Sequence, residues 1–312
     1  MSTEGSARAI IAALAANLGI AATKLIAWAL TGASSMLAES IHSIADSGNQ
    51  ALLLLGSRRA RRAPTDQHQF GFGRERYIYA FIVSIVLFTV GGLFALYEAY
   101  HKWHEVHEGH ENELLTSQWK WVPIVVLLAA IAMESYSFRT AIVESNHIRG
   151  RVGWVQFVRR ARAPELPVVL LEDFAALIGL MLAMFGVGMT LLTHNGYWDV
   201  VGTAGIGVLL VLVAIVLAVE TKSLLLGESA LDEQEALIEE TLRDSPGIGE
   251  VLNMRTLHVG PEELLIAVKI AVTDTESAAD VARAINAAEE RIRAAIPGAR
   301  YIFIEPDIKH LA

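Results

Sequence analysis

Four polar side chains recur along one stretch of an otherwise apolar sequence: Glu39, His42, Asp46 and Asn49. Their spacing of three, four and three residues places them on one face of an α-helix. An imidazole and a carboxylate one turn apart can share one metal ion, and this pair of donors suits zinc and its first-row neighbours. The stripe therefore indicates a divalent-cation site in which His42 and Asp46 are the first two ligands.

A second acidic pair, Glu172 and Asp173, interrupts the apolar segment 166–192, which contains no cation that could neutralise it. Neighbouring side chains on a helix point about 100° apart, so at most one of the two can face the His42 and Asp46 stripe squarely. We expect Asp173 to be that residue. Glu172 is then expected to complete the coordination from the side, to bond to a neighbouring helix, or to carry a proton.

Other ionisable residues in the apolar segments are expected to support this site or a proton path. Lys24 is expected to be a counter-ion to one of the carboxylates rather than a direct participant in transport. Glu134 is expected either to relay protons or to make a structural hydrogen bond. Glu39 and Asn49, which complete the stripe, are expected to hold the site or to hydrogen-bond between helices.

Two polar clusters lie outside the apolar segments. The tract HKWHEVHEGHE carries His101, His104, His107 and His110 at three-residue intervals, and we expect it to form an outer loop that binds divalent metal loosely. The alternative is that its His and Glu residues serve solubility. On the other side, the loop 64–77 offers Asp66 and His68 as further metal contacts, with glycines that permit tight turns.

The elements that position these residues follow from the hydropathy of the 312-residue chain, which is 53% hydrophobic, 19% charged and has a mean hydropathy of +0.42. A bilayer core needs about 20 mainly apolar helical residues to span it. Five segments meet this length plainly, and segment 36–55 is a sixth despite its polar stripe. We therefore predict six transmembrane helices over 9–30, 36–55, 78–97, 122–142, 166–192 and 200–219.

The arginines predict the orientation of these helices. Segments 57–76 and 144–165 hold six and five arginines, whereas the segments on the other side, 31–35, 101–120 and 193–199, hold zero, two and zero Lys or Arg. Basic residues favour the cytoplasmic side, so both termini are expected in the cytoplasm of a multi-pass protein of the cell or inner membrane.

The last ninety residues read as a separate soluble domain. Residues 232–244 are expected to form a helix, 249–260 and 263–274 two strands, 277–296 a helix and 299–308 a strand. This αββαβ order is that of a small, ferredoxin-like or metallochaperone-like α+β domain. The predicted division is a transport domain over 1–222 and a cytoplasmic dimerisation or regulatory domain over 223–312.

Charge and composition exclude several classes of function. Residues 223–312 carry 17 acidic and 8 basic residues, so this domain holds the whole net charge of −9. An acidic chain without a basic face is not expected to bind nucleic acid. The chain has no cysteine, which excludes thiolate metal sites and cysteine catalysis. No prosthetic group is expected.

Several motifs together resemble the cation diffusion facilitator family of metal/proton antiporters. They are LTGASSMLAESIHSIADSGNQALLLLG at 30–56, HQFGFGRERY at 68–77, LLEDFAALIGL at 170–180 and VLNMRTLHVGPEELLIAV at 251–268. The resemblance implies six helices, a cytoplasmic αββαβ domain and a homodimer. It also gives His42, Asp46 and Asp173 the roles of transport-site ligands.

The sequence departs from the family pattern at Val169, where the usual fifth-helix motif has its histidine four residues before the aspartate. LLED is similar to the branch that includes a mitochondrial zinc transporter, in which Glu172 is a plausible fourth ligand. Phe72 replaces a loop histidine that some members carry. In the tail, His258, Asp307 and His310 are weak candidate ligands.

The sequence thus predicts a secondary transporter that exports a divalent cation, Zn²⁺ first, in exchange for protons. One His with two or three carboxylates is a harder donor set than two His with two Asp, which makes Mn²⁺, Fe²⁺ or Co²⁺ the alternative cargo. Two other classes stay open at this point: an intramembrane metallohydrolase and a metal sensor.

Overall fold

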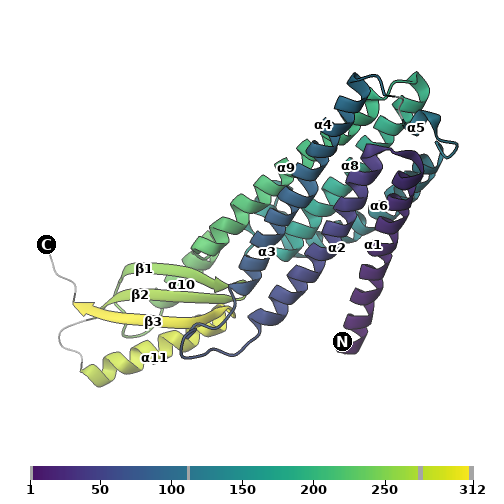
Figure 1. Ribbon diagram of the computed structural model, residues 1–312. Helices are drawn as coiled ribbons and strands as arrows, with labels where there is room; N and C mark the ends of the chain where they lie inside the picture. The colour runs from purple at the N-terminus through teal and green to yellow at the C-terminus, as the bar shows by residue number, and fades with distance from the viewer. Residues whose placement is uncertain (1–2, 111–112, 273–276, 309–312) are drawn as a thin grey trace. The chain divides into compact units, whose positions relative to one another are not determined.

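The computed structural model describes residues 3–110, 113–272 and 277–308 of the chain, with side chains described from residue 17 onward. The chain forms two compact units (Figure 1). The first contains Met1–Leu55, Tyr79–Val158 and Glu165–Glu220, and the second contains Gly56–Ile78, Arg159–Pro164 and Thr221–Ala312.

The described residues up to 226 are almost entirely helical, because a helix satisfies the backbone hydrogen bonds of an apolar segment internally. A helix covers each of the six segments predicted to span the membrane. The elements are α1 (Thr3–Thr31), α2 (Ser34–Ala60), α3 (Glu75–Val86), the π-helix η1 (Leu87–Leu93), α4 (Phe94–His107), α5 (Glu113–Thr116), α6 (Val122–Arg149), α7 (Trp154–Arg160), α8 (Glu165–Thr193) and α9 (Tyr197–Leu226).

Four helices of the described part are long and apolar enough to cross a membrane: Glu75–His107, Val122–Arg149, Glu165–Thr193 and Tyr197–Leu226. The first of these is α3, η1 and α4 joined into one continuous helix. The polar stripe keeps α2 out of this group, and the side chains of the first half of α1 lie outside the described part of the chain. A protein with these helices is a membrane protein, while the number of six spans stays a prediction.

The first unit is a bundle whose helices pack through small and aliphatic residues. Helix α6 runs along α8 and also packs against α1. Alanines at the contacts let the backbones approach closely, and fully buried larger residues such as Met36, Leu127, Leu180 and Leu210 fill the remaining space. The bundle therefore buries α2 and α8, which carry the two predicted parts of the site.

The second unit contains the small α+β fold expected for the tail. Its elements are α10 (Asp232–Arg243), β1 (Val251–Gly260), β2 (Glu263–Val272), α11 (Ala278–Ala295) and β3 (Ala299–Ile308), in the predicted order αββαβ. Strand β2 is central, antiparallel to β1 and parallel to β3. Alternate residues of β2, from Leu264 to Ile270, are buried in a core shared with Ile238 of α10 and Ile292 of α11.

Two segments that the sequence division placed with the membrane part belong instead to the second unit. They are 56–78, between α2 and α3, and 159–164, between α7 and α8. Their arginines pair with acidic residues of the tail: Arg160 contacts Asp232 at 3.1 Å, and Arg162 contacts Glu228. The same arginines that predict the membrane orientation thus have folded partners in the acidic domain.

Candidate metal site

The polar stripe of α2 lies inside the first unit. Glu39, His42 and Asn49 are fully buried, and the side chain of Asp46 is 18% exposed. His42 Nε2 lies 3.4 Å from Asp46 Oδ2. Within the described residues, neither ring nitrogen of His42 and neither Asp46 Oδ1 nor Asn49 Oδ1 has a hydrogen-bond partner. Buried polar atoms are rarely left unpaired, so these lone pairs are free to meet an ion.

The acidic pair of α8 is also buried, and its two carboxylates turn to different helices. Glu172 Oε1 accepts a 2.7 Å hydrogen bond from Asn49 Nδ2 of α2, whereas Asp173 Oδ2 accepts a 2.9 Å bond from Ser137 Oγ of α6. We expected Asp173 to face the stripe. In the structure the direct contact with the stripe comes from Glu172 instead. Adjacent residues on one helix face different neighbours, and the rotation of α8 in the bundle decides which faces α2.

Asp46 is the meeting point of these groups. Glu172, Glu134, Asp173 and Lys24 all lie close enough to interact with it electrostatically. The structure thus brings residues of α1, α2, α6 and α8 around one carboxylate. No three His, Asp or Glu side chains of the described ranges are gathered tightly enough to hold a metal ion in this arrangement. Coordination by both helices would require α2 and α8 to move their ligands closer together.

Lys24 has a specific partner within the bundle. Its Nζ lies 3.0 Å from Glu39 Oε2 and donates a 2.8 Å hydrogen bond to Ser43 Oγ. A Cβ at Gly179 of α8 would come within 2.6 Å of Glu39 Oε1, so α8 leaves no free space on that side of the carboxylate. The pair fixes one buried positive charge beside Glu39, which precedes His42 by about one helical turn.

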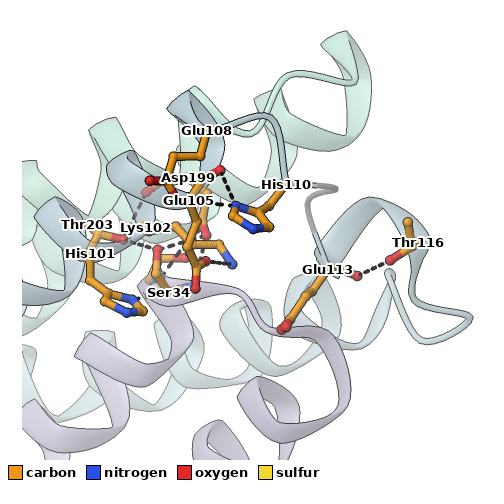
Figure 2. Close-up of polar contacts among 11 residues, drawn as sticks. Ser34, His101, Lys102, Glu105, Glu108, His110, Glu113, Thr116, Asp199 and Thr203 are labelled. Carbon is orange, nitrogen blue, oxygen red and sulfur yellow. Dashed lines mark hydrogen bonds and ion pairs between the residues drawn. The ribbon is translucent and has the colours of Figure 1, made fainter.

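The start of α2 is held by a residue that the sequence reasoning missed. Asp199, buried in the first turn of α9, accepts hydrogen bonds from the backbone N–H and the hydroxyl of both Ser34 and Ser35. Figure 2 shows Asp199 with Ser34 and Thr203 at this end of the bundle. A carboxylate at a helix N-terminus also meets the positive end of its dipole. The serine pair that opens α2 is a local sequence signal for a capped helix start, but its partner lies 164 and 165 residues away.

The π-helix η1 is a second feature with a weak sequence signal, the pair Gly91 and Gly92. A Cβ on Gly92 would lie 2.7 Å from a methyl group of Val211 in α9, and one on Gly91 would lie 3.2 Å from Leu210 and 3.9 Å from His42 Nδ1. Glycine is therefore required for the close approach of this helix to α9. π-Helical turns are frequent at functional sites, and this one passes His42.

The His and Glu tract corrects one expectation. His101, His104 and His107 belong to helix α4 rather than to a loop, and only His110 follows its end. Pairs spaced by one turn support the helix: His104 Nε2 lies 3.1 Å from Glu108 Oε1, and the ring of Trp103 stacks on that of His107. Figure 2 shows His101, Glu108 and His110 of this tract at the end of the bundle that holds Asp199.

The remaining candidates lie in the second unit or beyond the described chain. Asp66 and His68 are exposed residues of the segment 56–78, and the His68 ring lies 4.8 Å from the ring of Phe72. His258 is buried in β1, and Asp307 of β3 accepts a hydrogen bond from Lys269. His310 lies outside the described residues. Among the described residues of this unit, no metal cluster forms.

Comparison with known proteins gives one family match and several relatives. The family model for the cation efflux transmembrane domain matches residues 10–226. The chain is similar to the mitochondrial proton-coupled zinc antiporter SLC30A9 of Xenopus laevis, with 30% identity over 263 residues that cover 83% of this chain and 45% of the relative. It is also 30% identical to the human protein of the same name over 266 residues, covering 82% and 44% of the two chains.

A bacterial relative matches over more of its own length. The cation-efflux pump FieF of Pectobacterium atrosepticum is 25% identical over 294 residues, which cover 94% of this chain and 90% of the pump. By contrast, the chain spans less than half the length of the SLC30A9 proteins that it matches.

Proposed function

Because the chain belongs to the cation efflux family, whose transmembrane-domain model matches residues 10–226, we propose that it is a secondary transporter of divalent metal ions. Zn²⁺ is the proposed cargo and protons the counter-substrate. The family and its relatives are named as transporters and antiporters, so the protein is not an enzyme and the metallohydrolase alternative is set aside. A pure metal sensor is likewise less well supported than a transporter.

One observation carries the proposal. His42 is fully buried, neither of its ring nitrogens has a hydrogen-bond partner among the described residues, and its Nε2 lies 3.4 Å from Asp46 Oδ2. An orphaned imidazole inside a membrane bundle costs free energy unless it has a ligand to bind. We assign His42, Asp46 and Asp173 as ligands of the transported ion, with Glu172 as the fourth donor.

Proton exchange follows from the same donors. Imidazole must be neutral and carboxylates ionised to bind a metal, so an arriving ion displaces protons and arriving protons displace the ion. The contacts of Glu172 with Asn49 and of Asp173 with Ser137 would have to rearrange when an ion brings α2 and α8 together. Such a change of helix packing around a central site is the usual basis of alternating access.

Zinc is proposed first because the relatives with 30% identity are named as zinc antiporters. The donor set contains one His and up to three carboxylates and is therefore harder than a two-His site, so Mn²⁺, Fe²⁺ and Co²⁺ are the second candidates. A panel of these metals with Glu172→Gln separates the alternatives: loss of a carboxylate should weaken the harder ions most.

We further propose a multi-pass protein of the inner cell membrane with both termini in the cytoplasm, from the six and five arginines of the two inner segments. Export from the cytoplasm then corresponds to movement from that side outward. The αββαβ domain is proposed to mediate a homodimer or to regulate transport.

The test is metal-dependent proton flux in proteoliposomes that contain the purified full-length chain. We expect Zn²⁺ to drive proton movement in the wild type, and Asp46→Asn or Asp173→Asn to reduce the flux at least tenfold. Asp244→Asn, at an exposed position of the second unit, is the control and should retain it. If both variants keep the flux of the wild type, the proposed site is wrong. If the wild-type protein shows no proton flux with any metal, the proposed function is wrong.

A further inference from the structure

A cavity of about 520 Å³ lies within the second unit, between the segment that joins α2 to α3 and the turn that joins β1 to β2. Four arginines line it: Arg61, Arg62, Arg76 and Arg300. Its volume is in the range of sites that bind small molecules. None of the residues considered for metal binding lines this cavity.

The charges around the cavity do not balance. Two glutamates are among the lining residues, and each is engaged: Glu262 by Arg76 at 3.5 Å, and Glu263 by Arg300. Arg61 and Arg62 make no ion pair with any residue that the structure describes, and the Arg62 guanidinium lies 5.4 Å from the centre of the Phe72 ring. The cavity therefore has a surplus of two positive charges.

The walls of the cavity are packed together rather than loosely apposed. A Cβ on Gly73 would lie 2.9 Å from the Cα of Gly260 and 3.0 Å from the carbonyl oxygen of Val259. The loop before α3 thus rests directly on the β1–β2 turn through two glycines. The Glu263 carboxylate also lies against Gly73, with its Oε2 2.7 Å from the same Cβ position. The loop and the sheet therefore close around one volume, which the arginines of both line.

The cavity also adjoins the N-terminus of a long helix. Helix α3 begins at Glu75, between the lining residues Gly73 and Arg76, and the continuous helix runs on to His107. The N–H groups of Glu75 and Arg76 are bonded to the carbonyl oxygens of Phe72 and Gly73, so the helix contributes its dipole, whose positive end favours an anion here, rather than free donors. This helix is one of the candidate membrane spans, and a bilayer that it crosses would have one surface near its first turn.

We propose that this cavity binds a phosphate group, carried by the headgroup of an anionic phospholipid or present as a free phosphate. A guanidinium group binds two oxygens of a phosphate through paired N–H donors. Such a site therefore depends on geometry as well as on charge. Basic pockets at the cytoplasmic ends of membrane helices suit anionic headgroups. The cavity would then fix the second unit's loop to a lipid at the membrane surface.

The arginines that set membrane orientation provide a matched control. The segment 57–76 contains six arginines, of which Arg61, Arg62 and Arg76 line the cavity, whereas Arg58 and Arg59 do not. Replacement of either adjacent pair removes two positive charges from the same block. A general electrostatic effect predicts equal losses from the two replacements, and a site at the cavity predicts unequal ones.

The experiment measures binding to the purified full-length chain in a nonionic detergent at fixed salt. Short-chain phosphatidylglycerol and inorganic phosphate are titrated separately, with short-chain phosphatidylcholine as the zwitterionic comparison. We expect saturable binding of phosphatidylglycerol that Arg61→Gln/Arg62→Gln weakens at least tenfold and Arg58→Gln/Arg59→Gln weakens less than threefold. Competition by inorganic phosphate identifies a free phosphate as a second ligand, and its absence identifies the headgroup alone.

Thermal unfolding of each variant checks that it folds. If the glutamine pair is unstable, Arg61→Lys/Arg62→Lys keeps both charges but loses the paired N–H donors, and it should bind severalfold more weakly than the wild type. Equal weakening by the cavity pair and the control pair would overturn the proposal, as would unsaturable binding, or equal binding of phosphatidylcholine and phosphatidylglycerol.

Discussion

At the scale of single residues, the buried ion pair of Lys24 and Glu39 sets the charge of the bundle interior. A charge inside a membrane protein is tolerated when a partner meets it, and each member of this pair has that partner at 3.0 Å. Glu39 Oε1 has no hydrogen-bond partner among the described residues and sits against Gly179. The pair is therefore tightly enclosed, and loss of one member leaves the other as an unpaired charge buried among apolar residues.

Replacement of Lys24 by methionine should destabilise the protein by about 3–5 kcal/mol, because it leaves the Glu39 carboxylate buried without a cation. Lys24→Met/Glu39→Gln removes both charges and should recover most of that loss. Thermal unfolding of the full-length chain in detergent measures both variants. If the double variant is as unstable as the single one, Lys24 stabilises the bundle by packing or through Ser43, and the ion-pair account is wrong.

At the scale of the elements, α2 is anchored at its first turn by a residue of α9. Asp199 accepts four hydrogen bonds from Ser34 and Ser35, and the hydroxyl of Thr203 lies 3.0 Å from Ser34 Oγ. This contact fixes the end of the helix that carries His42 and Asp46. Movement of α2 during transport would have to keep this capping contact or break it.

Asp199→Asn should cost about 2 kcal/mol, because an amide replaces a charged acceptor and turns an N–H₂ group toward donors. We also expect the substitution to reduce metal flux, because the lost contact positions α2. Asp280→Asn is the matched control: it removes a carboxylate from the first turn of α11, where Asp280 contacts Ser277 and Arg283 of the same helix start. Hydrogen exchange at the first turn of α2 should rise in Asp199→Asn and not in the control.

Equal hydrogen exchange at α2 in both variants would show that Asp199 stabilises its own helix alone.

The η1 segment also acts at the scale of the elements. Its glycines let this helix pack closely against α9, and Gly91 lies beside His42. Here again a close contact between elements decides where the proposed ligands lie.

At the scale of the whole molecule, the acidic tail forms one compact unit with the basic segments 56–78 and 159–164. Arg160 pairs with Asp232 and Glu233, Arg162 with Glu228, and Arg76 with Glu262. The Arg160 pairs are the more exposed ones and contribute up to about 1 kcal/mol each, whereas Arg162 and Glu228 are partly buried. The pairs therefore determine which segments associate more than they stabilise the association. The net charge of −9 is therefore partly compensated where the tail meets the loops.

The second unit should lose stability as the pH falls through the ordinary range of histidine. Burial, assisted by the Arg162 guanidinium and opposed by Glu228, lowers the pKa of His258 below its usual 6.5. The unfolded chain therefore takes up a proton near pH 6.5 that the folded chain excludes. Stability is complete above that value and falls below it by at most about 1.4 kcal/mol per pH unit.

This pH dependence can be measured by hydrogen exchange of β1 and β2 amides in the full-length chain between pH 7.5 and 5.5, after correction for intrinsic exchange rates. His258→Gln should flatten the dependence, while His68→Gln, at an exposed position, should leave it unchanged. A dependence that persists unchanged in His258→Gln would assign it to another group.

Much of this protein is determined by local sequence alone. The apolar runs predicted a helix in each of six segments, and the alternation and turn residues of the tail predicted its αββαβ order, because both depend on periodicity within one element. The His42 to Asp46 spacing likewise determined that both side chains share one face of α2. The helical His tract of α4 was missed, although its i,i+4 pairs are a local signal too.

The tertiary structure decided which residues meet. The rotation of α8 turned Glu172 toward Asn49 and Asp173 toward Ser137. The packing of α1 placed Lys24 in contact with Glu39. The tertiary structure also placed Asp199 on the first turn of α2 and paired Arg160 and Arg162 with acidic residues of the tail. Spacing along a chain specifies a face of a helix, but the azimuth of that helix and its neighbours are set by side-chain packing over distant residues.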